Sequence, residues 1–153
     1  MNRMDETVTA LRIVRRLLAT PDEVFDAWTD ADSIRQWMCP GETRVTVAEI
    51  DARVGGRFRI VMSTGDWHME HTGEYLEVRR SERLVFTWRS STTRDRETVV
   101  TVELRPVGNE TELILVHERF PDGESRAKHQ DGWTAIVEKL TEKLAAHLGH
   151  GGD

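Results

Sequence analysis

The longest stretch of regular hydrophobic spacing lies near the C-terminal end of the chain, from about Asp122 to Leu148. Apolar side chains recur there every three or four residues, which places them on one face of a helix. They are Trp133, Ile136, Val137, Leu140, Leu144 and Leu148. At about 1.5 Å per residue, a helix over this stretch is roughly 37 Å long, enough to cross a whole sheet. The pattern therefore predicts one long helix with a single core-facing side.

Upstream of this helix, six segments show the alternation of apolar and polar residues that is typical of strands. They are Thr43–Ile50, Arg57–Thr64, Trp67–Val78, Leu84–Ser90, Glu97–Arg105 and Glu112–Phe120. Turn signals such as Gly55-Gly56 and Gly108-Asn109 separate them. Because parallel crossovers need about a dozen residues or more, these short links predict sequential antiparallel hairpins.

A first strand, Thr7–Leu18, precedes two short predicted helices. The first helix begins at Thr20–Glu23, where threonine, proline and glutamate form a capping box with proline at the first helical position. The second begins at Asp30 or Asp32 and ends at Pro40-Gly41.

The order of these elements predicts an α+β fold in a single domain over residues 1–153. A seven-stranded, curved antiparallel sheet would wrap around the long C-terminal helix. We expect residues 7–148 to form the folded core and residues 149–153 to be a frayed tail. Because a strongly curled sheet seldom closes tightly on a helix, the arrangement leaves room for a cavity.

Composition narrows the class of protein. The formal net charge of -6 argues against a nucleic-acid partner, because the phosphate backbone attracts basic surfaces. The single cysteine, Cys39, excludes an intramolecular disulfide framework and fits a reducing compartment. The N-terminal residues contain no apolar signal segment, and no apolar run reaches the length of about 18 residues that a membrane span needs. We therefore expect a cytoplasmic protein without membrane insertion.

Seven short segments match, in order, the characteristic sequence of one known family. They are Thr20–Asp30, Gln36–Pro40, Gly55–Met62, Gly73–Val78, Glu82–Trp88, Thr111–Glu118 and Gly132-Trp133. Together they resemble the Hsp90 ATPase activator homologue-like branch of the START/Bet v 1-like (SRPBCC) superfamily. This chain departs from the branch at Met38 and Cys39, where an aromatic residue and a glycine are typical.

The resemblance implies the helix-grip fold, with a small apolar or amphipathic molecule bound between the C-terminal helix and the sheet. Some members of the superfamily are cyclases or hydrolases. The namesake of the branch stimulates a chaperone ATPase.

The first candidate site is accordingly a ligand cavity between helix and sheet. Its apolar lining would comprise Trp37, Met38, Phe58, Ile60, Met62, Met69, Trp88, Trp133 and Val137. Methionine and tryptophan provide adaptable, polarisable walls, as ligand pockets require. Apolar periodicity alone is equally compatible with a filled core, so the hollow interior rests on the resemblance.

His71, His117 and His129 are the polar groups expected in this cavity, with Tyr75 and Arg15 as further candidates. His117 continues the inward side of its strand, and His129 lies on the apolar face of the long helix. A neutral imidazole could hydrogen-bond a ligand carbonyl or act as a general base near pH 7. The alternative for each histidine is burial with its hydrogen bonds satisfied by protein groups. In an enzyme, His117, His129 and Tyr75 would be the catalytic candidates.

Three further features bear on the site. Gly132 costs about 1 kcal/mol relative to alanine inside a helix, so we expect the sheet to approach closely there, the alternative being a gap at the pocket mouth. Cys39 is expected to act as a small apolar residue. His68 and His71 should face opposite sides of a strand, and no HExxH motif or cysteine pair is present, so we expect no metal site.

The sequence thus favours a protein that binds a small hydrophobic or amphipathic molecule, without a cofactor, over an enzyme. A cofactor-independent cyclase or hydrolase that uses the same pocket is one alternative. An interaction protein that modulates a chaperone ATPase is the other. Homodimerisation through a sheet face or edge strand stays open.

Overall fold

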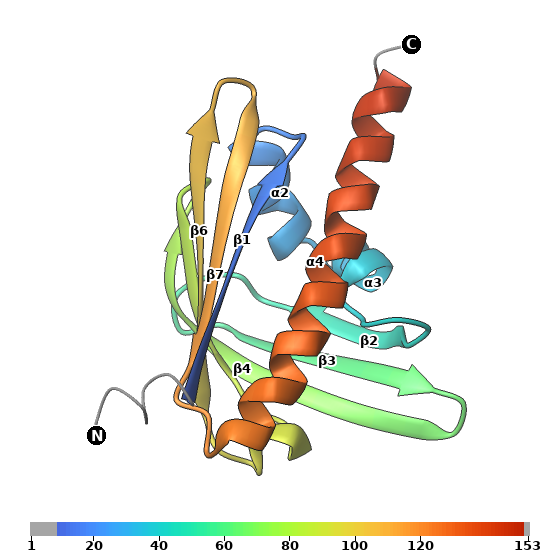
Figure 1. Cartoon of the computed structure of the whole chain (residues 1–153), viewed down its shortest axis with the longest axis vertical. Helices are drawn as coiled ribbons and strands as arrows, with labels where there is room; N and C mark the ends of the chain where they lie inside the picture. Colours follow the sequence, from blue (N-terminus) through green and yellow to red (C-terminus); the bar gives the residue numbers. More distant parts are fainter. Residues whose placement is uncertain (1–8, 152–153) are drawn as a thin grey trace.

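Apolar alternation shapes the chain into one seven-stranded antiparallel sheet that curves around a long helix (Figure 1). The computed structural model describes residues 9–151. The strands are β1 (Ala10–Leu17), β2 (Arg44–Ile50), β3 (Arg57–Thr64), β4 (Trp67–Arg79), β5 (Arg83–Trp88), β6 (Thr98–Val107) and β7 (Glu110–Glu118). The helices are α2 (Pro21–Thr29), α3 (Ala31–Trp37), the short 3-10 helix η1 (Ser91–Thr93) and α4 (Gly123–Gly151). The predicted α+β helix-grip fold is confirmed.

The strand order is β1-β7-β6-β5-β4-β3-β2, so the predicted hairpins from β2 to β7 are present and β1 pairs with β7. Irregularities in the register between Val45 and Val47 and between Tyr75 and Glu77 bend β2 and β4. Gly73 allows close packing within this bend, because a Cβ atom there would lie 2.0 Å from the carbonyl oxygen of Thr87. The sheet consequently curls towards α4 (Figure 1).

The helices begin where the sequence indicates. Thr20 and Glu23 form the predicted capping box, with the Glu23 amide donating to the Thr20 hydroxyl at 3.3 Å. Asp30, not Asp32, caps α3, because its carboxylate accepts from the Ser33 amide at 3.0 Å. Within residues 9–151, none of the helices is both long and apolar enough to span a membrane.

The core lies between the concave face of the sheet and the apolar side of α4. Its contributions from α4 are Trp133, Ile136, Val137, Leu140 and Leu144, all buried. The side chain of Leu148, the last apolar position of the pattern, lies outside the described residues. Likewise, residues 7 and 8 of the expected first strand are outside them, and β1 begins at Ala10. Helix α4 continues to Gly151, into the segment expected as a tail.

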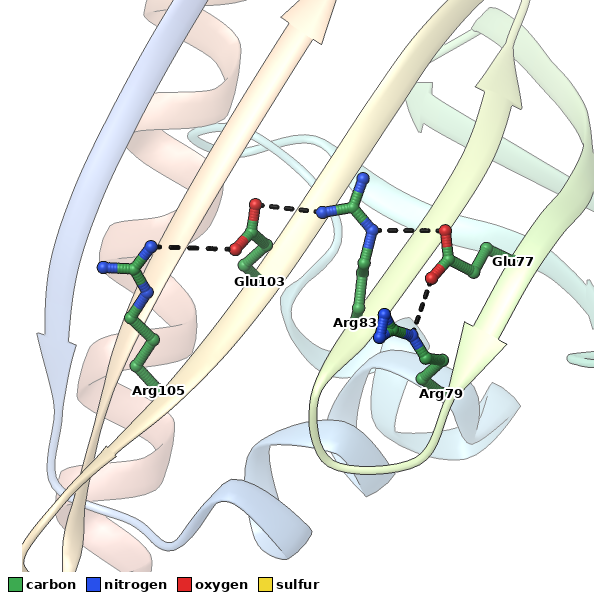
Figure 2. Close-up of polar contacts among 5 residues, drawn as sticks. All are labelled: Glu77, Arg79, Arg83, Glu103 and Arg105. Carbon is green, nitrogen blue, oxygen red and sulfur yellow. Dashed lines mark hydrogen bonds and ion pairs between the residues drawn. The ribbon is translucent and has the colours of Figure 1, made fainter.

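A ladder of charged side chains crosses the opposite face of the sheet, over β4, β5 and β6 (Figure 2). Glu77 accepts from Arg79 at 2.8 Å and from Arg83 at 3.2 Å. Arg83 also donates to Glu103 at 3.0 Å, and Glu103 lies 3.9 Å from Arg105. Hydrogen bonds from Arg79 and Arg83 hold the pKa of Glu77 below its usual value. Arg83 is therefore the central link of the ladder.

Replacing Arg83 should have a small, salt-dependent effect on the stability of the fold. We expect Arg83→Gln to lower the melting temperature slightly at low ionic strength, with the difference shrinking as salt screens the remaining charges. Arg105→Gln is the control, because it removes only the 3.9 Å contact at the end of the ladder. Thermal unfolding at low and high salt checks this, and equal losses for both variants would contradict it.

Candidate functional site

A cavity of about 170 Å³ lies between α4 and the strands β3, β4 and β5. Its walls are formed by Pro40, Thr43, Met62, Trp67, Met69, His71, Trp88, Thr92, Lys128, His129, Gly132, Trp133 and Ile136. The surface of the cavity is almost wholly apolar. Trp67 and Lys128 are exposed, so they mark its mouth.

Half of the twelve residues predicted to line a ligand cavity lie in these walls. They are Met62, Met69, His71, Trp88, His129 and Trp133. The other half pack in the core beside the cavity. They are Trp37, Met38, Phe58, Ile60, His117 and Val137. Thus the cavity lies beside the C-terminal end of β3, the N-terminal half of β4 and the first half of α4.

The filled part of the interior lies beneath α3. Met38, Phe58 and Ile60 surround a void of only about 10 Å³, which is about the space of a single water molecule. The ring of Phe58 lies edge-on to Phe86, with centroids 5.6 Å apart, and 5.7 Å from Tyr75. These aromatic side chains close off the space into which a larger cavity would extend.

Sequence reasoning missed six wall residues: Pro40, Thr43, Trp67, Thr92, Lys128 and Ile136. Lys128 lies one helical turn before Gly132, so helix geometry could have found it. Trp67 offered another signal, because a tryptophan beside the Gly65-Asp66 turn has few neighbours to cover it, and it is 55% exposed. Nothing in the sequence placed Thr92, which reaches the wall because η1 forms where only a turn was expected.

The expectation of close packing at Gly132 is wrong. A Cβ atom built on Gly132 would meet no other heavy atom within 4 Å, apart from the neighbouring residues and backbone of its own helix. The alternative, a gap at the pocket, describes the structure, and Gly132 lines the cavity. The sheet diverges from α4 at this point, and the missing side chain enlarges the space between them.

His117 belongs to a fully formed hydrogen-bond chain. The indole N–H of Trp133 donates to His117 Nδ1 at 2.9 Å, which leaves the ring proton on Nε2. Nε2 then donates to the Thr98 hydroxyl at 2.7 Å, and Thr98 donates to the Trp88 carbonyl at 2.5 Å. Burial lowers the pKa of His117 well below its usual value. His117 therefore orients Trp133 and has no nitrogen free for a ligand.

His129 is the polar wall residue on α4. Its Nδ1 lies 2.8 Å from the Ser125 carbonyl oxygen, which can only accept, so Nδ1 carries the proton. Nε2 consequently presents a lone pair, whose nearest partner is the Thr92 hydroxyl at 3.5 Å. The Ser125 hydroxyl donates to the Thr92 carbonyl at 2.5 Å and fixes η1 to the helix. Burial lowers the pKa of His129, which favours the neutral ring.

His71 contributes a second neutral imidazole from β4. Its ring is 4% exposed and lies 4.8 Å from the ring of Trp88. Burial is the main cause that lowers the pKa of His71 to about 4, so the ring is neutral near pH 7. His71 Nδ1 and Trp88 Nε1 are buried without a hydrogen bond of normal geometry. The backbone of Ile60 and Met69 interacts with the His71 ring, so the clearest unmet donor of the wall is Trp88 Nε1.

Of the three catalytic candidates, only His129 lines the cavity. Tyr75 packs against Phe86 at 6.0 Å between ring centroids, and burial raises the pKa of its hydroxyl. Arg15, a further polar candidate, lies 3.7 Å from Glu138 of α4 and does not line the cavity. The site is therefore an apolar chamber with few polar atoms and with one charged side chain, Lys128, at its mouth.

Metal-binding and nucleophilic groups do not gather at this chamber. Among the residues that the structure describes, no group of three or more His, Cys, Asp or Glu side chains could hold a metal ion. His68 is exposed and His71 buried, so the two lie on opposite faces of β4 as predicted. Cys39 is buried at 4% exposure as expected, but its sulfur also accepts a hydrogen bond from Lys139 Nζ at 3.5 Å.

A curved antiparallel sheet that grips a C-terminal helix over an apolar chamber defines a helix-grip protein of the START/SRPBCC class. Within this class, the model of the family "Activator of Hsp90 ATPase homolog 1-like protein" matches residues 18–145. The chain belongs to this family. The comparison with curated proteins finds no match.

Solved structures agree with this assignment. A protein from Chromobacterium violaceum is 27% identical with a TM-score of 0.82, over 89% of this chain and 96% of that one. An AHSA1 protein from Silicibacter pomeroyi is 28% identical with a TM-score of 0.80, over 90% and 99%. An Hsp90 activator from Plasmodium falciparum shares the fold, at 23% identity and a TM-score of 0.72, over 90% and 96%.

Proposed function

We propose that the protein binds a small hydrophobic or amphipathic molecule in the cavity beneath α4. The observation that carries this proposal is the apolar chamber of about 170 Å³ at Gly132, where the sheet and the helix separate. A dry apolar cavity of about 150 Å³ is large enough for a benzene ring. The chamber thus suits one ring or a short alkyl chain. A longer ligand would extend past Trp67 and Lys128, where a polar end would meet water.

The size of the chamber also sets the expected affinity. An aromatic ring that buries about 150–250 Å² at about 25 cal/mol per Å² gains roughly 4–6 kcal/mol before ordering costs. Because ordering costs reduce this gain and about 4 kcal/mol corresponds to 1 mM, dissociation constants for single-ring probes should lie near 1 mM or above. Binding assays need probes at millimolar concentration. Trp88 and Trp133 in the wall provide a fluorescence signal.

Filling the open space beside Gly132 should strongly weaken the binding of a ligand in the cavity. We expect Gly132→Leu to place its side chain in the open space and to weaken binding of a single-ring probe at least tenfold, while improving helix propensity by up to about 1 kcal/mol. Fluorescence titration and thermal unfolding measure both effects. Ala127→Leu is the matched control, because Ala127 is exposed on the same helix and does not line the cavity.

Two results would count against the proposal. One is that no apolar probe at millimolar concentration changes the fluorescence or the melting temperature of the wild-type protein. The other is that Gly132→Leu, folded and at least as stable as the wild type, binds the probe unchanged.

Family membership favours a second function, modulation of an Hsp90 ATPase. The test is to measure the ATPase rate of an Hsp90 with and without this protein. If the contact uses the outer surface, Gly132→Leu should modulate the rate as the wild type does, because its new side chain lies inside. If the wild-type protein leaves the Hsp90 ATPase rate unchanged, this second proposal is wrong, and the ligand-binding proposal is unaffected.

A further inference from the structure

The cavity wall holds hydrogen-bonding atoms that the protein itself does not satisfy. The clearest is Nε2 of His129, which must carry a lone pair because Nδ1 donates to the Ser125 carbonyl at 2.8 Å. Among residues 9–151, the hydrogen-bond partner of Nε2 is the Thr92 hydroxyl at 3.5 Å. Hydroxyl donors normally approach to about 2.5–3.0 Å. Nε2 is therefore an acceptor with at most a weak donor.

The proton of Thr92 has a nearer partner. The Thr92 hydroxyl lies 2.8 Å from the Ser90 hydroxyl and 3.9 Å from the sulfur of Met69. Either hydroxyl can be the donor in this 2.8 Å pair. When Thr92 donates to Ser90, its single proton does not reach His129; when Ser90 donates, the Thr92 proton reaches His129 Nε2 only over the long distance of 3.5 Å.

A second unmet atom lies on the facing sheet. Trp88 Nε1 is a buried donor without a hydrogen bond of normal geometry, and its ring lines the same cavity. A buried polar atom is costly to leave unpaired, which favours a ligand that reaches it.

The charges around the cavity restrict the ligand's polar group. Lys128 is the charged side chain in the wall; it is exposed at the mouth and pairs with Glu124 at 3.2 Å. A carboxylate inside would lose its hydration and face the lone pair of His129, and an ammonium would lose its hydration without a counter-charge. A ketone or an ether accepts hydrogen bonds but cannot donate to Nε2. A hydroxyl is the smallest neutral group that donates and accepts.

We propose that the ligand of this cavity carries a hydroxyl group that donates a hydrogen bond to Nε2 of His129. This inference rests on the proposed function and names the chemical class of the ligand: a small alcohol or phenol. The hydroxyl oxygen can in turn accept from a wall donor, while the remaining carbon skeleton contacts the methionine and tryptophan side chains.

Phenol and toluene test the inference, because they have the same number of heavy atoms and differ by a hydroxyl in place of a methyl group. We expect the ratio of the toluene to the phenol dissociation constant to fall about fivefold to tenfold in His129→Leu, since one hydrogen bond is lost. Ala127→Leu is the control, because Ala127 is exposed on the same helix and does not line the cavity, so this variant should leave the ratio unchanged. Anisole, which only accepts, should not respond to His129→Leu as phenol does.

A spectroscopic measurement covers the case in which His129→Leu does not fold. In the wild-type protein, the ¹⁵N resonance of His129 Nε2 should move upfield when phenol binds, as for a lone pair that accepts a hydrogen bond, and should not do so with toluene. If toluene binds but neither the ratio nor the resonance responds to the hydroxyl, this inference is wrong and the proposed function stands. If benzoate binds as tightly as phenol, the inference is also overturned. If no probe binds, the proposed function fails with it.

Discussion

Lowering the pH from about 7.5 to about 4.5 should destabilise the protein by about 3 kcal/mol or more. The main reason is the buried ring of His71, whose pKa falls from 6.5 to about 4 on folding. Each pH unit of difference corresponds to about 1.4 kcal/mol, so this one histidine contributes about 3 kcal/mol. His117 and His129 act in the same direction, because burial lowers the pKa of both.

The sign follows from where the proton binds. Between pH 6.5 and about 4, the unfolded chain protonates His71 and the folded protein does not. Acid therefore favours the unfolded state, and stability rises with pH across this window. The contribution of His71 is complete above about pH 6.5, is lost as the pH falls, and levels off below the folded pKa.

Urea unfolding at a series of pH values measures this dependence. His71→Asn should flatten the curve between about pH 4 and 6.5. Asp122→Asn is the control. The Ser125 amide holds the pKa of the Asp122 carboxyl below its usual value, so this carboxyl changes the stability only at a lower pH than His71 does. A slope that is unchanged in His71→Asn would contradict the assignment.

Trp133→Ala should cost about 3–5 kcal/mol of unfolding free energy, the range for loss of a large buried aromatic side chain. Trp133 is 2% exposed, and its ring lies 5.2 Å from Trp88 and 6.1 Å from Trp28. The substitution would also remove the donor to His117 Nδ1. The loss therefore combines a cavity with an unsatisfied buried acceptor.

Trp133→Phe separates these two contributions. It keeps an aromatic ring but removes the indole N–H, so it should cost about 1–3 kcal/mol for the unpaired nitrogen of His117, in addition to the smaller ring. Trp67→Phe is the matched control, because Trp67 is 55% exposed and surface changes are usually worth less than about 0.5 kcal/mol. Equal stability of Trp133→Phe and the wild type in denaturant unfolding would show that the hydrogen bond is not a stabilising feature.

The fold could be predicted from the sequence because each element depends on local periodicity. The spacing of apolar residues defined α4, and strand alternation placed Leu115 and His117 on the inward side, where both are buried. The pairing of β1 with β7 was not predicted, because Ile13 and its partner Leu115 are far apart in the chain. Alternation identifies the face of a strand, not its neighbour across the sheet.

The shape of the cavity could not be predicted from the sequence, for a different reason. Periodicity states which way a side chain points, and it does not give the distance between the two surfaces. Val137 and Gly132 both face the sheet side of α4, yet Val137 is fully buried in the core and Gly132 borders open space. The inward direction of His117 was predicted, whereas its bonds to Trp133 and Thr98 depend on the relative positions of three elements.

The pairing of β1 with β7 has a consequence for synthesis on the ribosome. Ala10 lies opposite Glu118, so the two partners are about 100 residues apart in the chain. At roughly 5–20 residues per second, translation needs about 5–20 s to deliver the second strand after the first. During that interval the edge of β1 has no native partner, and such long-range pairing slows folding. Of the seven strands of this sheet, β1 leaves the ribosome first and is among the last to find its partner.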